Sequence, residues 1–143
     1  MIVDIGGGTT GLSILEGGKV VYVADEPTGG THLSLVLAGN YGISFDEAEK
    51  IKKERSRQKE IFPVVKPVLE KMASIIKSHI KGRQIPAVYL VGGTCCLKDM
   101  ENVIAKETGL SVYKPANPFL VTPLGIALSC ADKEVEGESR NAD

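Results

Sequence analysis

The sequence has no tryptophan, and aromatic residues make up only 5% of its 143 positions. No run approaches the ~20 consecutive apolar residues that a membrane-spanning helix needs, and the first residues lack the basic and apolar regions of a signal peptide. We therefore expect no membrane span and no secretion signal. The net charge of −1 also excludes a strong overall field that would attract nucleic acid or anionic lipid.

Cysteine and histidine are scarce as well. Cys95 and Cys96 are adjacent, Cys130 stands alone, and no two of the three have Cys-x-x-Cys spacing. Adjacent cysteines rarely pair, so we expect reduced thiols and a cytoplasmic protein. His32 and His79 have no ligand-like neighbours, which argues against a zinc-type site.

The residues that are present are typical of a folded α/β domain, because 43% are hydrophobic and most of these are aliphatic. Apolar runs at 2–5, 12–15 and 20–23 predict three strands. The segment Glu16-Gly17-Gly18-Lys19 between the last two has the composition of a hairpin turn. The chain is therefore expected to open with three antiparallel strands.

Helices are expected to follow these strands. A short helix over residues 31–38 would be capped by Thr31 and stopped by Gly39. Apolar residues at three- and four-residue steps then predict a long amphipathic helix that ends before Gly82.

The segment between these two helices is polar. Ser44 and Glu47 fit a capping box, so a second short helix is expected to begin there. The run 50–60 is rich in charge and predicts an exposed helix end and a loop. Pro63 and Pro67 must then lie at or before the first turn of the long helix, because proline is tolerated there.

The last third of the chain alternates strands and helices. Residues 87–91 form a continuous apolar strand, which predicts that both of its faces are covered. A helix over about 98–108 and a short strand at 111–113 follow. Thr122 and Pro123 look like the start of a final helix that reaches about residue 131.

This order predicts a ribonuclease-H-like mixed sheet of about five strands, with flanking helices and a small helical insert. Residues 1–39 and 83–132 would form the ribonuclease-H-like subdomain, and 40–82 would form the inserted helical subdomain. Residues 133–143 would be a charged, frayed tail.

Gly6, Gly8 and Gly11 formally match the dinucleotide fingerprint G-x-G-x-x-G, and Asp25 follows near the distance that it requires. That fingerprint needs a helix to begin at the glycines, so that the helix N-terminus meets the pyrophosphate. Here the glycines lead into the strand at 12–15 instead. We therefore reject a Rossmann site.

A phosphate-binding hairpin is the better interpretation. Glycines let backbone N–H groups approach phosphate oxygens closely. Thr9 and Thr10 add hydroxyl donors, and Asp4 could hold Mg²⁺ or orient an attacking water. A turn that merely shapes the hairpin is the alternative. This purely structural alternative is less favoured, because glycine pairs also occur at 29–30 and 92–93.

These segments together resemble the actin/heat-shock/hexokinase ATPase superfamily. Residues 3–10 resemble its second phosphate motif, 88–94 its adenosine motif and 122–127 its second connecting helix, with the Gly29-Gly30 pair between them. The match runs in order over about residues 2–131. Within the superfamily, residues 24–30 and 46–50 most resemble the ethanolamine-utilization EutJ family, which is encoded beside bacterial microcompartment enzymes and usually called chaperone-like.

The resemblance implies ATP or ADP, with Mg²⁺, as the ligand. It places the catalytic residues Asp4 and Thr9 on the metal and γ-phosphate side, with Asp4 as the metal ligand. The remaining implied nucleotide contacts are Gly6, Gly7, Gly8, Thr10, Gly29, Gly30, Glu49, Lys52, Gly92, Gly93 and Thr94. Glu49 and Lys52 could equally be a solvated helix face.

The sequence departs from the superfamily in having a single Asp-x-Gly-Gly-Gly motif, because members bind ATP between two similar halves. We expect a missing N-terminal half or a partner chain to supply the rest. Without that half, Leu124, Ala127, Leu128 and Ala131 should leave an apolar patch exposed, so we also expect the isolated chain to form a homodimer or a larger assembly. The implied function is a chaperone or reactivating factor for a microcompartment enzyme, in the cytoplasm or associated with the microcompartment. A filament or interaction module of the cell-division or rod-shape actin type, and part of a small-molecule kinase, are the alternatives. One of the two halves of the ATP site is expected to hydrolyse ATP very slowly, if at all, because phosphoryl transfer depends on groups from both halves.

Overall fold

A five-stranded mixed sheet in the order β3-β2-β1-β4-β5 forms the centre of the structure. The computed structural model describes the backbone of residues 1–139 and the side chains of residues 1–130. The strands are β1 (Ile2–Ile5), β2 (Thr10–Glu16), β3 (Lys19–Glu26), β4 (Ala87–Val91) and β5 (Ser111–Tyr113). β1, β2 and β3 pair antiparallel, whereas β4 pairs parallel with β1 and with β5. This confirms the predicted ribonuclease-H-like sheet.

The β2–β3 hairpin explains the first strand boundaries. Gly17 and Gly18 have φ angles of 56° and 78°, the left-handed values that a tight two-residue hairpin turn requires. The pairing continues as far as Thr10 with Glu26, so β3 extends three residues beyond the predicted end at residue 23.

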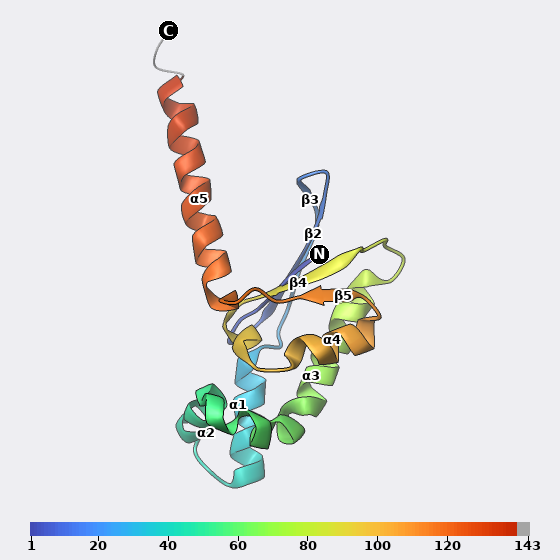
Figure 1. Cartoon of the computed structure of the whole chain (residues 1–143), viewed down its shortest axis with the longest axis vertical. Coiled ribbons are helices and arrows are strands. Elements are labelled where there is room, and N and C mark those ends of the chain that lie inside the picture. Colours follow the sequence, from blue (N-terminus) through green and yellow to red (C-terminus); the bar gives the residue numbers. More distant parts are fainter. Residues whose placement is uncertain (140–143) are drawn as a thin grey trace.

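One face of the sheet is covered by helices. In Figure 1, α1 (Gly30–Tyr41), α3 (Gln58–Ile80) and α4 (Met100–Thr108) lie below the sheet. Alternate strand residues point into this layer, as the period of a strand requires. The fully buried large side chains include Ile5, Leu12, Ile14, Leu33, Leu37, Leu69, Met72, Ile76, Leu90 and Ile104.

These side chains form one hydrophobic cluster that runs from the sheet into the segment 40–82. The cluster includes Ala48 of α2 (Phe45–Lys53) and Ile61 of α3. The division of the chain into a nucleotide-binding subdomain and an inserted subdomain stays a prediction.

The opposite face of the sheet is open. Tyr89 in the middle of β4 is 50% exposed and stacks on Tyr113 of β5 at 5.4 Å between ring centroids. The expectation that both faces of this strand are covered is therefore wrong for the described part of the chain. The physical reason is that α5 (Pro118–Ser139) leaves the sheet and extends away from it (Figure 1).

The capping box is confirmed. The backbone N–H of Ser44 donates to Glu47 Oε2 at 2.9 Å, and the N–H of Glu47 donates to Ser44 Oγ at 3.3 Å. The charged run after α2 contains a short 3₁₀ turn, η1 (Arg55–Arg57), and then the first turn of α3. Residues 50–60 are therefore more helical than the exposed helix end and loop that the sequence predicts.

The two prolines of α3 are a correction. Pro63 and Pro67 lie inside the helix and not at its start. Both are exposed, so the carbonyl groups that lose a helical partner can be hydrated. The opposite face buries Ile61, Val65 and Leu69 completely, and this packing holds the helix across the two missing hydrogen bonds.

Several helix ends also differ from the prediction. Gly29 and not Thr31 is the N-cap of α1, which passes Gly39 and ends at Gly42 with a left-handed φ of 64°. α5 begins at Pro118, so Thr122 lies within the helix and does not cap it. The helix continues through Ser139, and residues 140–143 lie outside the described part. The charged, frayed tail over residues 133–143 stays a prediction.

None of the helices within residues 1–139 combines the length and the hydropathy that crossing a membrane demands.

We expect Leu69→Ala to lower the free energy of unfolding by about 2–5 kcal/mol, because it opens a cavity in the fully buried layer between α3 and the sheet. Leu35→Ala is the matched control, since Leu35 is a helical leucine that is 55% exposed, and should change stability by less than about 0.5 kcal/mol. Urea denaturation followed by circular dichroism measures both. Equal losses in the two variants would show that the helix layer is packed differently.

Candidate functional site

The Gly6–Gly8 turn connects β1 to β2 and offers free donors. The N–H of Gly6 closes the turn by donating to Thr9 O at 3.0 Å. The N–H groups of Gly7, Gly8 and Thr9 form no hydrogen bond with any other described residue, and all three residues are exposed. Successive free N–H groups of this kind can form an anion-binding nest.

The Gly29-Gly30 pair packs directly against this turn. The N–H groups of Gly30 and Thr31 donate to the carbonyl oxygens of Gly6 and Gly7 at 2.9 and 2.8 Å. A Cβ on Gly29 would lie 2.6 Å from Gly7 O, which explains why only glycine fits. Both glycines are buried, so the structure brings them against the Gly6–Gly8 turn without exposing them.

The third glycine segment meets the same point. Gly92 has a φ of 95° and begins the short 3₁₀ helix η2 (Gly93–Cys96). Thr94 Oγ1 donates to Gly6 O at 2.8 Å. The structure therefore brings together all three glycine segments that the sequence singled out.

The two threonines of the turn differ in their surroundings. Thr10 is only 3% exposed, and its hydroxyl donates to Thr28 O at 2.7 Å. That hydroxyl is engaged in fastening β2 to the segment before α1. Thr9 is exposed beside the free N–H groups.

Asp4 lies near the end of β1 and faces the root of α5, by which we mean the first residues of that helix, 118–122. Its Oδ2 accepts a hydrogen bond from Thr122 Oγ1 at 2.6 Å. A Cβ on Gly92 would collide with Asp4 Oδ1, so both carboxylate oxygens are directed toward the β4–η2 loop and α5.

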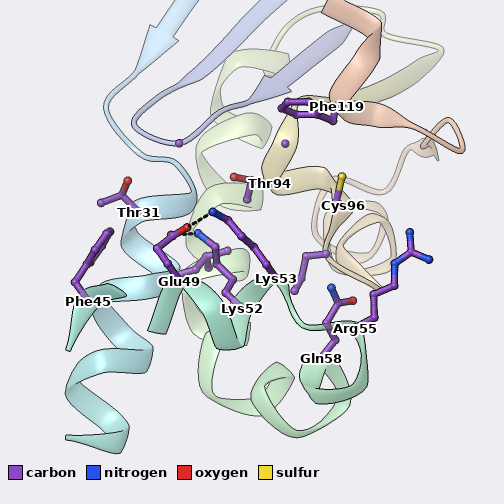
Figure 2. Close-up of a pocket in the computed structure, with 14 residues that line it drawn as sticks. Thr31, Phe45, Glu49, Lys52, Lys53, Arg55, Gln58, Thr94, Cys96 and Phe119 are labelled. Carbon is purple, nitrogen blue, oxygen red and sulfur yellow. Dashed lines mark hydrogen bonds and ion pairs between the residues drawn. The ribbon is translucent and has the colours of Figure 1, made fainter. Parts of the chain in front are cut away.

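A cleft of about 550 Å³ lies beside the joined glycine segments, within the size range of small-molecule sites. Figure 2 shows it between α2 on one side and η2 with the start of α5 on the other. The lining residues are Gly7, Thr31, Leu33, Phe45, Glu49, Lys52, Lys53, Arg55, Gln58, Gly93, Thr94, Cys96, Leu97 and Phe119.

Five of the predicted contact residues line this cleft: Gly7, Glu49, Lys52, Gly93 and Thr94. The other predicted residues are not among those that line it: Asp4, Gly6, Gly8, Thr9, Thr10, Gly29, Gly30 and Gly92.

Glu49 is the charged centre of the cleft. It accepts hydrogen bonds from Ser34 Oγ and Lys52 Nζ, and Lys53 Nζ lies 3.0 Å from its Oε2 (Figure 2). Burial opposes ionisation of the carboxyl, but the hydrogen bonds from Lys52, Ser34 and Lys53 outweigh it and lower the pKa of Glu49 to about 2. Glu49 is therefore a carboxylate at neutral pH and can accept hydroxyl donors.

Lys52 links this cluster to the glycine segments. Its Nζ also donates to Gly30 O at 3.0 Å, and the side chain is only 14% exposed. An ammonium group with two fixed partners beside the Gly6–Gly8 turn brings a positive charge close to the proposed anion nest.

Sequence reasoning missed several lining residues. Arg55 and Gln58 belong to the charged run 50–60, for which the sequence predicts an exposed helix end and a loop. Phe119 lies in the first turn of α5, where a loop was expected, and its ring lies 3.3 Å from the position that a Cβ on Gly93 would occupy. The available signal was an aromatic residue beside a proline in a sequence with few aromatics.

The chain is similar to proteins of known families. The family described as type IV pilus assembly protein PilM matches residues 1–131. Over 133 residues the chain is 49% identical to the ethanolamine utilization protein EutJ of Escherichia coli K12, covering 92% of this chain and 47% of that protein. The chain thus spans about half the length of the curated relatives it matches.

Solved structures also include a EutJ protein and proteins of the actin-like fold. The crystal structure of EutJ from Carboxydothermus hydrogenoformans is 56% identical, with a TM-score of 0.86 over 89% of this chain and 48% of that one. MreB5 of Spiroplasma citri bound to AMPPNP is 18% identical, with a TM-score of 0.77 over 96% of this chain and 54% of that one. The second likeness shows the actin-like fold alone.

We expect acid to weaken the fold through Glu49. Since the folded-state pKa of about 2 lies below the ordinary value of 4.5, the stabilisation is fully present above about pH 4.5 and is lost as the pH falls toward 2. Glu49→Gln should be less stable than the wild type at pH 6, and the difference should shrink below pH 4. Urea midpoints across this pH range measure it.

Glu70→Gln is the control for this titration, because Glu70 forms only an exposed ion pair with Lys66 at 3.7 Å and such pairs contribute little. A wild type and a Glu49→Gln variant with parallel stability curves between pH 6 and 3 would contradict the role assigned to Glu49.

Proposed function

Because the chain belongs to the family described as type IV pilus assembly protein PilM, and because it is about half identical to EutJ proteins, we propose that it is the ATP- or ADP-binding half of an actin/heat-shock-type ATPase. The observation that carries this proposal is that Gly7 and the Lys52 ammonium line the same cleft. The N–H groups of Gly7 and of the next two residues, Gly8 and Thr9, form no hydrogen bond with any other described residue. Donors and a cation arranged around a concave site are what a polyphosphate requires.

The phosphates would bind at the Gly6–Gly8 turn, with Thr9 on the γ-phosphate side. Gly93 and Thr94 would flank the adenosine, and the Glu49 carboxylate would accept hydrogen bonds from ribose hydroxyls. Lys52 would hold Glu49 in place and offset the negative charge of the phosphates.

Mg²⁺ fits this set of residues. No group of three metal-ligating side chains exists among the described residues, but Mg²⁺ bound to phosphates needs only one or two protein carboxylates. Asp4 would be that carboxylate, and the ion would neutralise charge on the phosphates. Asp4 would first have to turn from Thr122, its present partner.

Hydrolysis by this chain alone is proposed to be very slow. The chain covers 47% of the length of E. coli EutJ, and phosphoryl transfer depends on positioning and charge neutralisation from both sides. By its similarity to EutJ, the chain would act in a chaperone-like or reactivating role on an ethanolamine-utilization enzyme, in the cytoplasm or at a microcompartment.

Calorimetric titration with ATP and ADP in the presence of Mg²⁺ tests the proposal. We expect binding by the wild type and a loss of at least tenfold in affinity for Gly93→Val, because a side chain there meets Phe119 at the wall of the cleft. Gly39→Val is the matched control, since a Cβ on Gly39 meets no atom within 4 Å. The absence of heat from folded wild-type protein would overturn the nucleotide assignment.

A second candidate role, as an interaction module, is favoured by the exposed apolar surface. Leu120, Leu124 and Leu128 of α5 are each more than half exposed. Ala127 is exposed as well, and the side chain of Ala131 lies outside the described residues. The open sheet face adds a second apolar area, with a hollow of about 760 Å³ between Ile2, Tyr89, Tyr113 and Val121.

We therefore expect the isolated chain to associate, at least to a dimer, because apolar patches of this kind favour protein contacts. Light scattering across a concentration series measures this, and Leu124→Glu together with Leu128→Glu should shift the chain toward the monomer. Lys66→Glu, on the exposed side of α3, should leave the association unchanged. A wild type that stays monomeric at high concentration would contradict the expectation.

A further inference from the structure

The root of α5 is fastened to the rest of the chain at a few points. The N–H of Gly92 donates to Pro118 O at 2.9 Å, and Thr122 Oγ1 donates to Asp4 Oδ2 at 2.6 Å. Phe119 adds the contact beside Gly93. From Phe119 to Cys130 every residue is exposed, so the position of the helix depends on its first turn (Figure 1).

The hydroxyl of Thr122 also has a possible acceptor within its own helix. A helical threonine can donate to the carbonyl four residues earlier, which here is that of Pro118. That carbonyl already accepts the N–H of Gly92. The hydroxyl can therefore bond either to the carboxylate of Asp4 or to the backbone of its own helix.

The same turn is softened by Pro123, which lies inside α5. Proline has no N–H, so the carbonyl of Phe119 lacks its helical partner, and helices bend most readily at such a position. Thr122 thus has two possible acceptors for its hydroxyl and lies next to a helical turn that lacks one hydrogen bond, where the helix can bend.

We propose that Thr122 is a positioning residue of the nucleotide site, whose hydrogen bond to Asp4 couples the occupancy of that carboxylate to the orientation of α5. The proposal rests on the proposed function, since Asp4 is the carboxylate assigned to the cation. When Asp4 turns toward the phosphate side, Thr122 loses its charged acceptor, its hydroxyl turns back to Pro118 O, and α5 reorients about Pro123.

Pulsed electron–electron double resonance measures the distance between two spin labels and can therefore report the orientation of α5 in the full chain. One spin label is attached to the native Cys130, which is exposed, and a second to α3 through Glu70→Cys. Cys96→Ser removes the thiol at the cleft. Cys95 is fully buried, and burial raises the pKa of its thiol to about 12, so it stays unlabelled. Dilution with unlabelled protein removes distances between copies.

With Asp4 and Thr122 unchanged in the labelled protein, we expect one distance distribution without nucleotide, a shifted distribution with ATP and Mg²⁺, and no shift with ATP and EDTA. Thr122→Val should show the shifted distribution without any ligand, and Thr122→Ser, which keeps the hydroxyl, should behave as the wild type. Thr122→Val should also bind Mg²⁺-ATP roughly fivefold more tightly, the size of a weak coupling between two sites, because Asp4 no longer has to leave Thr122.

Asp4→Asn separates the two roles of that residue. The amide oxygen still accepts the hydrogen bond of Thr122, so the ligand-free distribution should be that of the wild type, whereas Mg²⁺-ATP should no longer shift it. An unchanged distribution in Thr122→Val with and without nucleotide overturns the inference and leaves nucleotide binding intact. Absence of calorimetric heat from the folded wild type overturns the proposed function instead.

Discussion

The carbonyl oxygen of Gly6 joins the three glycine segments of this protein. It accepts the N–H of Gly30 at 2.9 Å and the hydroxyl of Thr94 at 2.8 Å. These donors come from the start of α1 and from the loop after β4, which are far apart in the sequence. A single backbone acceptor thus fixes the turn between β1 and β2 against the start of α1 and against η2.

The close contacts around this oxygen explain why glycine occurs where it does. A side chain on Gly29 would meet the carbonyls of the turn, and one on Gly92 would meet Asp4 and Ile5 O. Close backbone approach is thus a structural requirement at these positions, whatever ligand is bound. The turn itself differs, because Gly7 and Gly8 have open space around them and their N–H groups have no partner among the residues that the structure describes. This arrangement favours an anion.

Asp4 connects this centre to α5. The carboxylate of this residue, near the end of a central strand, accepts a hydrogen bond from Thr122 of α5, a helix that otherwise projects from the body (Figure 1). The apolar character of α5 and of the open sheet face means that both surfaces gain from being covered. The protein therefore combines a ligand cleft with an exposed apolar element whose root touches that cleft through Phe119.

The sequence by itself determined the strands and most of the helices, because alternation, capping residues and glycine stops are local signals. The capping box at Ser44 and the strands at Ala87–Val91 and Ser111–Tyr113 follow from a few neighbouring residues. It also singled out all three glycine segments, since glycine clusters at strand ends are unusual enough to be noticed.

Only the tertiary structure decided how these parts are used. Pro63 and Pro67 remain within α3 because buried residues on the opposite face hold the helix. The engagement of Thr10 with Thr28, the bond between Thr122 and Asp4, and the places of Arg55, Gln58 and Phe119 around the cleft depend on contacts across many residues. Local patterns carry no record of such contacts, because the partner of each side chain is set by packing and not by its neighbours in the sequence.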